Sequence, residues 1–383
     1  MPLSLGLEDT HVLITGGAGL IGSAVVRAFA QEGAHVSSVD IAHDDAPSDD
    51  EDDEPAETDY SGPGTLHEYH GDVADEASLA RAWRRAVAEN GPVGCCVALA
   101  GLDLSVLPHH DEEEGRGGGV ADVSVEQFRR TLDVNVVGTF LTARQWLRGI
   151  RDAEGSWEYL ENACLVLVGS ESGWFGERGH PDYAAAKSAV QGGLLKSLAA
   201  DAPRVYGKAR WVLSFLFSFS FPIFLFVLLL SSFPPVFFFS FLFRSVAAFA
   251  WSENHLSNLN LCSCHRVNAV APGPVDTARF RQECVENPEQ LWLDAQATVS
   301  ARFPDVQSRM CADVDFPQTG LGKPVPVDAV ARSILFLASD NFSSHVHGQV
   351  LNVDSGKQGK VLWPKEDIVD LRSPSQSQTS EED

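Results

Sequence analysis

The stretch TGGAGLIG at residues 15–22 stands between an apolar run, His11–Ile14, and a segment with helical spacing of its apolar side chains, Ile21–Gln31. This pattern predicts a strand, a tight turn and a helix in succession. Glycines at positions 16, 19 and 22 permit the turn and a close backbone approach, and the helix N-terminus offers free N–H groups to a phosphate. We therefore predict a dinucleotide-binding unit, with a plain glycine turn as the alternative.

Further apolar runs alternate with helical patterns, which is typical of a parallel sheet with crossover helices. The run 163–168 is apolar throughout, as expected for a central strand buried on both faces. We predict one doubly wound, Rossmann-like α/β domain over residues 1–365. Its strands are expected at His11–Ile14, His35–Val39, Leu66–Tyr69, Cys95–Leu99, Ala163–Val168, Val267–Ala271 and Val350–Val353.

The composition limits the possible functions. The chain has 383 residues with a formal net charge of −25, and 44% of them are hydrophobic, which excludes a wholly disordered protein. A negative field repels phosphate backbones, so nucleic acid is not an expected partner. Seven cysteines without framework spacing, and no recognisable secretory signal, indicate a reducing, cytoplasmic location.

Two polar segments are expected to lie outside the folded core. Ten carboxylates fall within Asp44–Asp59, so residues 43–64 are predicted to form an acidic, disordered surface insertion. A site for cations or for a basic partner is the alternative for this insertion. Residues 366–383 are predicted to form a disordered tail.

Asp40 ends the second predicted strand, 24 residues after Gly16. A carboxylate at this point accepts hydrogen bonds from the adenosine ribose hydroxyls and repels a 2′-phosphate. No Lys or Arg lies in the glycine turn or directly after Asp40, so NAD is favoured over NADP. The alternative is that Asp40 merely opens the acidic insertion.

Tyr183 and Lys187 are four residues apart, so on a helix they share one face. An ammonium near a phenol is expected to lower the phenol pKa from about 10 towards the range useful for proton exchange. Ser170 stands 13 residues before Tyr183, at the C-terminal end of the predicted central strand. That edge of an open α/β sheet is where ligands bind.

The sequence resembles the short-chain dehydrogenase/reductase family in its single-domain form, from about Glu8 to Gly356. The matches follow the order of the family's motifs. They are Thr15–Gly22, Asp40, Gly71–Val73, Leu132–Gly138 with Asn135, Ser170, Tyr183–Lys187, Pro272–Thr277 and Leu351–Asp354.

The resemblance implies a role for each catalytic candidate. Tyr183 would be the general acid or base, and Lys187 would hold the nicotinamide ribose and lower the phenol pKa. Ser170 would hydrogen-bond the substrate oxygen, with Ser172 as the alternative serine. Asn135 would support a proton relay through water.

The resemblance also implies a nicotinamide dinucleotide site and no metal. The residues expected to hold the cofactor are Thr15, Gly16, Gly19, Leu20, Ile21, Gly22, Asp40, Asp72, Val73, Ala100, Gly101, Tyr183, Lys187, Pro272, Gly273, Val275 and Thr277. One departure from the family is Ala98, where an Asn is usual. Its missing side-chain hydrogen bonds are expected to leave the sheet less tightly tied at this point.

Residues 212–265 form an apolar insertion that the family does not have. Its first part, Val212–Phe243, has 32 residues without a charge, of which 28 are Phe, Leu, Ser or Pro, the residues whose codons can be wholly pyrimidine. We interpret it as a retained intron, with a membrane anchor or a genuine structured insertion as alternatives. The group Cys262-Ser263-Cys264-His265 is too small to fill a tetrahedral metal site.

We predict an NAD(H)-dependent oxidoreductase that interconverts a small-molecule alcohol and ketone, with residues 276–320 closing its pocket. By analogy with the family, a homo-oligomer is expected. One alternative is a catalytically silent dinucleotide-binding protein, which would bind cofactor without turnover. Another is a membrane-tethered enzyme, which would partition into detergent and resist a carbonate wash.

Overall fold

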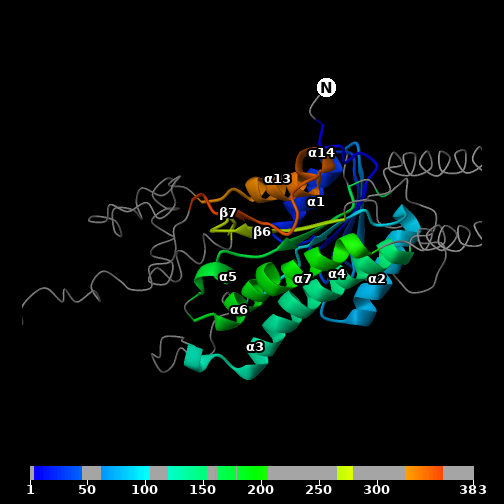
Figure 1. Ribbon diagram of the computed structural model, residues 1–383. Helices are drawn as coiled ribbons and strands as arrows, with labels where there is room; N and C mark the ends of the chain where they lie inside the picture. Colours follow the sequence, from blue (N-terminus) through cyan, green and yellow to red (C-terminus); the bar gives the residue numbers. More distant parts are fainter. Residues whose placement is uncertain are drawn as a thin grey trace, which may run out of the picture.

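A computed structural model describes residues 4–44, 62–103, 120–152, 160, 162–177, 179–205, 265–278 and 324–356 (Figure 1). Several predicted segments lie outside these ranges: most of the acidic insertion, the apolar insertion except His265, most of residues 276–320, and the tail.

The core of the protein is one sheet of seven parallel strands in the order β3-β2-β1-β4-β5-β6-β7, so the predicted doubly wound fold is confirmed. Strand order reverses between β1 and β4, and in such sheets a crevice opens at the carboxyl ends of the strands at this point. The strands are β1 (His11–Thr15), β2 (His35–Asp40), β3 (Thr65–His70), β4 (Cys95–Ala98), β5 (Cys164–Val168), β6 (Arg266–Pro272) and β7 (Val350–Val353).

Helices cover both faces of the sheet (Figure 1). One face carries α1 (Gly22–Gln31), α13 (Val327–Ala338) and α14 (Asp340–Ser343). The other carries α2 (Glu76–Asn90), α3 (Val125–Leu132), α4 (Thr139–Asp152), α5 (Ser172–Phe175), α6 (Pro181–Ala189) and α7 (Leu195–Asp201). Two π-helical turns continue this second layer, η4 (Asp133–Gly138) before α4 and η6 (Val190–Leu194) between α6 and α7.

The side chains of the central strand β5 contribute to the hydrophobic cores on both faces of the sheet. Its five residues are all buried, and they alternate between the two cores: Leu165 and Leu167 face one, Cys164, Val166 and Val168 the other. This is the burial expected of a strand covered on both faces.

Four strands are longer than predicted by one residue at one or both ends. Two other predicted strands run one residue past the observed ones, for local backbone reasons. Ala163 lies outside β5 because Asn162 before it has a left-handed backbone, with φ 58°. Leu99 lies outside β4 because its N–H turns back to the carbonyl of Val97. Ala98, where the family has Asn, is held in register between Thr15 and Leu167 on the neighbouring strands.

The three cysteines in the described ranges, Cys95, Cys96 and Cys164, are buried free thiols. Among the helices within those same ranges, none is long and apolar enough to cross a bilayer.

The two ends of the gap at residues 206–264 lie close together in the fold. It leaves after Val205, at the end of α7 and the short 3₁₀ turn Ala202–Arg204, and it returns at His265, directly before β6. The His265 Nδ1 atom lies 3.2 Å from the Ala202 carbonyl oxygen, and the ring packs edge-on against Trp146. The two ends of residues 206–264 are therefore adjacent.

The free energy of unfolding is expected to fall as the pH drops below the ordinary His pKa, because His11 is buried. Its Nδ1–H donates to the Gly91 carbonyl and its Nε2 accepts from the Ser37 hydroxyl, both at 2.8 Å, so the folded protein holds the ring neutral. Burial lowers the pKa of His11 to about 4. The unfolded chain binds a proton below pH ~6.5, so between pH 7 and pH 5 this residue should remove about 2 kcal/mol of stability.

Urea unfolding at pH 7, 6 and 5 measures this effect. His11→Asn should lose most of the dependence on pH, whereas the same change at exposed His345 should keep it. An unchanged slope in His11→Asn would contradict the prediction.

Candidate active site

A cavity of about 980 Å³ opens at the carboxyl ends of the strands, at the reversal of strand order. It is lined by all the predicted site residues except Thr15 and Asn135. The lining includes Gly16, Gly19, Leu20, Ile21, Gly22, Asp40, Asp72, Val73, Ala100, Gly101, Ser170, Tyr183, Lys187, Pro272, Gly273, Val275 and Thr277. Residues from eight separate segments of the chain thus meet at one edge of the sheet.

The glycine turn leaves no room for side chains on its inner side. Gly16 has a left-handed backbone, with φ 79°, and a Cβ atom there would lie 2.6 Å from the Ala100 Cα atom. A Cβ atom at Gly22 would overlap the Gly16 carbonyl oxygen. The turn therefore needs glycine for close backbone packing, and residues of the turn line the cavity.

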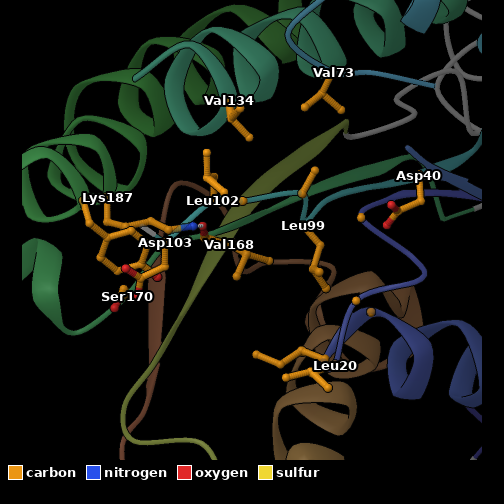
Figure 2. Close-up of a pocket in the computed structure, with 18 of the residues that line it drawn as sticks. Leu20, Asp40, Val73, Leu99, Leu102, Asp103, Val134, Val168, Ser170 and Lys187 are labelled. Carbon is orange, nitrogen blue, oxygen red and sulfur yellow. Dashed lines mark hydrogen bonds between the residues drawn. The ribbon is translucent and has the colours of Figure 1, made fainter. Parts of the chain in front are cut away.

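Asp40 lies beside this turn, at the end of the cavity opposite Ser170 and Lys187 (Figure 2). Its Oδ2 accepts the N–H of Ala18 at 3.1 Å and its Oδ1 accepts that of Ala42 at 3.0 Å. These bonds fix the carboxylate at the tip of β2. Thr15 is different, because it is a buried residue of β1, 1% exposed, and does not reach the cavity lining.

Tyr183, Lys187 and Ser170 meet at the other end of the cavity. Helix α6 places the Lys187 Nζ atom 5.5 Å from the centre of the Tyr183 ring, and this atom donates to the Val168 carbonyl at 3.1 Å. The Ser170 hydroxyl lies close enough to the Tyr183 phenol to lower its pKa. The helix and the end of β5 thus bring a phenol, an ammonium and a hydroxyl together.

The pKa of Tyr183 is raised, contrary to the prediction that the ammonium lowers it. Burial is the main cause, and the charges of Asp103 and Glu177 add to it, while the Ser170 hydroxyl acts in the opposite direction. Burial also lowers the pKa of Lys187 to about 8, although Asp103 raises it. A lysine that is only partly charged near pH 8 has a weaker influence on the phenol.

Asn135 is buried beside the site but does not line the cavity. Its Nδ2 donates to the carbonyls of Leu102, at 2.7 Å, and Thr131, at 3.0 Å, which ties the segment after β4 to the helical layer. A Cβ atom at Gly101 would lie 2.9 Å from the Asn135 Oδ1 and 3.2 Å from the Lys187 Nζ. Gly101 therefore lets the backbone pass directly beside the amide and the ammonium.

The alternative serine, Ser172, has a different partner. Its hydroxyl donates to the Glu177 carboxylate at 2.7 Å, whereas the Ser170 hydroxyl accepts the Ser172 N–H at 3.2 Å and acts on the pKa of Tyr183.

The sequence reasoning missed five acidic residues of the cavity. Glu126 and Asp133 lie on α3 and η4, and the other three are Asp103, Glu171 and Glu177. Figure 2 shows Asp103 grouped with Ser170 and Lys187. No spacing in the sequence indicates Asp103, Glu171 or Glu177, since each belongs to the irregular chain beyond a strand or short helix. Of these three, only Glu171, next to Ser170, had a neighbour that could have pointed to it.

The chain is similar to known oxidoreductases. A family model for short chain dehydrogenases matches residues 10–205. A 2,5-dichloro-2,5-cyclohexadiene-1,4-diol dehydrogenase of Sphingobium indicum is 30% identical over 205 residues, which cover 53% of this chain and 68% of that enzyme. A 3-oxoacyl-[acyl-carrier-protein] reductase of Thermotoga maritima is 26% identical, covering 91% of this chain and 98% of the relative.

Solved structures show the same fold at lower identity. Levodione reductase superimposes with a TM-score of 0.55 at 19% identity, over 91% of this chain and 98% of that one. An NADH-dependent reductase of alginate metabolism gives a TM-score of 0.55 at 16% identity, over 93% of this chain and 100% of that one. With the parallel sheet and the family match over half of the sequence, these findings establish that the chain belongs to the short-chain dehydrogenase/reductase family of oxidoreductases.

Proposed function

We propose that the protein is an NAD(H)-dependent oxidoreductase that interconverts an alcohol and a ketone, with Tyr183 as its general acid or base. The observation that carries the proposal is the meeting of Tyr183, Ser170 and Lys187 in the cavity that also holds the glycine turn.

The lining residues fit a dinucleotide along the length of the cavity. The turn at Gly16–Gly22 suits the pyrophosphate because residues of the turn line the cavity and its glycines leave no side chain in the way. Asp40 and Asp72 would hold the adenosine end, and the segment Pro272–Thr277 the nicotinamide end. When bound, the nicotinamide supplies or accepts the hydride.

The chain's own side chains would handle the proton. In ketone reduction the Tyr183 hydroxyl donates a proton to the substrate oxygen while the Ser170 hydroxyl donates a hydrogen bond to the same atom. At neutral pH the Tyr183 phenol, whose pKa is raised by burial, carries the proton that this direction requires. Lys187, fixed on the Val168 carbonyl, places its positive charge beside the phenol as the proton leaves.

Asp40→Ala is expected to reduce the preference for NADH over NADPH by about tenfold or more, because a like charge no longer faces the 2′-phosphate. Steady-state ratios of kcat/KM for the two cofactors measure this. Asp328→Ala removes the same charge from an exposed position on α13 and should leave the ratio unchanged. An unaltered ratio in Asp40→Ala would remove Asp40 from the ribose.

A panel of alcohols and ketones, assayed by NADH formation or consumption with the full-length chain, tests the proposed reaction. Cofactor binding without turnover of any substrate would support a catalytically silent protein instead. We further propose that the protein is a homo-oligomer in the cytoplasm. Sedimentation of the purified protein measures the oligomeric state. A carbonate wash of cell membranes tests whether the protein is attached to a membrane instead.

A further inference from the structure

Gln191 is a buried glutamine whose side chain reaches Ser170 from the helical layer. It lies four residues after Lys187, in the π-helical turn η6, and is 1% exposed. The Ser170 N–H donates to its Oε1 at 2.9 Å. The sequence reasoning gave Gln191 no role.

The Gln191 amide supplies the acceptor that the sheet does not provide for the Ser170 N–H. Along β5 and its extension, the N–H groups of Gly169 and Glu171 bond to carbonyls of β6, whereas that of Cys164 bonds to Gly94, on the β4 side. Because N–H groups alternate in direction along a strand, the N–H of Ser170 points to the β4 side. Strand β4 has already ended, since its last residue pairs with Leu167. The Gln191 amide takes the place of a strand carbonyl.

Two glycines make room for this amide. A Cβ atom at Gly169 would overlap the Gln191 Oε1, and one at Gly173 would lie 2.7 Å from its Nε2 and 2.9 Å from the carbonyl carbon of Lys187. The amide therefore fills the space between the end of β5 and helix α5. The π-helical turn carries it, and such turns are frequent at functional sites.

The hydrogen bond therefore links Ser170, which follows β5, to the helix that carries Tyr183 and Lys187. Tyr183 and Lys187 project from α6, and Gln191 follows on the same continuous helix. We propose that Gln191 is a positioning residue, whose amide fixes the Ser170 backbone, and with it the Ser170 hydroxyl, relative to the helix that carries Tyr183 and Lys187. The expected effect on turnover rests on the proposed function, whereas the contact itself does not.

Two measurements on Gln191→Met and Gln191→Glu test the proposal. Methionine keeps the volume without the acceptor, and glutamate keeps an acceptor oxygen. Hydrogen–deuterium exchange of the Ser170 amide should become about tenfold faster or more in Gln191→Met and stay near the native rate in Gln191→Glu. The kcat should fall by about 10- to 100-fold in Gln191→Met, with KM for NADH within about twofold, because a misplaced hydroxyl weakens the transition state.

Combination with Ser170→Ala separates positioning from general packing. If Gln191 acts through Ser170, Gln191→Met should lower kcat no further in the Ser170→Ala background. Gln349→Met, at an exposed glutamine, is the matched control and should change neither the exchange rate nor kcat. Should Gln191→Met not fold, Gly173→Ala displaces the amide by contact and should give the same two effects.

Native exchange of the Ser170 amide in Gln191→Met, or an equal further loss of kcat in the Ser170→Ala background, would overturn the proposal. A chain that turns over no substrate would instead refute the proposed function. In that case the exchange rates alone decide whether Gln191 holds Ser170.

Discussion

Tyr183→Phe is expected to lower kcat by about 10²- to 10⁴-fold while NADH affinity changes by less than about twofold. The substitution removes the one hydroxyl that can exchange a proton with the substrate oxygen, yet it keeps the ring that packs beneath the Lys187 ammonium. The Ser170 hydroxyl remains, and with it a hydrogen-bond donor for the substrate. Stopped-flow single turnovers with NADH and quenching of intrinsic fluorescence on cofactor binding measure the two quantities.

The matched control is Tyr69→Phe, on the edge strand β3. Tyr69 is buried and donates to Glu89 at 2.5 Å, and it does not line the cavity. Its loss should cost stability and leave kcat within about twofold. Full activity in Tyr183→Phe would refute the acid–base assignment, and weakened NADH binding with unchanged kcat would place Tyr183 in binding instead.

The largest expected loss of stability belongs to Arg266→Met. Arg266 is 1% exposed at the start of β6, and its guanidinium closes the C-terminal end of helix α13. It donates to the carbonyls of Leu337 and Ala338, to the Ser343 hydroxyl and to the Asp340 carboxylate. Methionine would leave the Leu337 carbonyl with only the Ser343 hydroxyl as a donor and the Ala338 carbonyl with only the weak Cys164 thiol. We therefore expect the free energy of unfolding to fall by about 3–5 kcal/mol.

Urea unfolding followed by far-UV circular dichroism measures this loss. Arg332→Met, at an exposed position on the same helix, should change the midpoint little. Because Asp340 is more than half exposed, its ion pair should contribute little, and Asp340→Asn should retain most of the stability. A native midpoint in Arg266→Met would show that the helix end finds other donors.

The sequence allowed the sheet, the glycine turn and a large part of the cavity lining to be predicted, for physical reasons. Glycine spacing and apolar runs are local patterns, and the carboxyl ends of parallel strands must meet at one edge. The raised pKa of Tyr183 could not be predicted in this way, because it comes mainly from burial in the folded site, and then from the charges of Asp103 and Glu177 on separate segments. Gln191 was missed because its partner is a backbone N–H at the end of β5, and no local sequence pattern indicates such a contact.

The hydrogen bond between His265 and Ala202 gives the fold a built-in seam. Because this contact brings the two ends of residues 206–264 together, a message without the codons between them would still encode all the described elements on both sides. The family match also stops at Val205. The seam is equally an attachment point for protein engineering: a reporter domain with adjacent termini could be grafted there, one strand away from β5 and the serine that follows it.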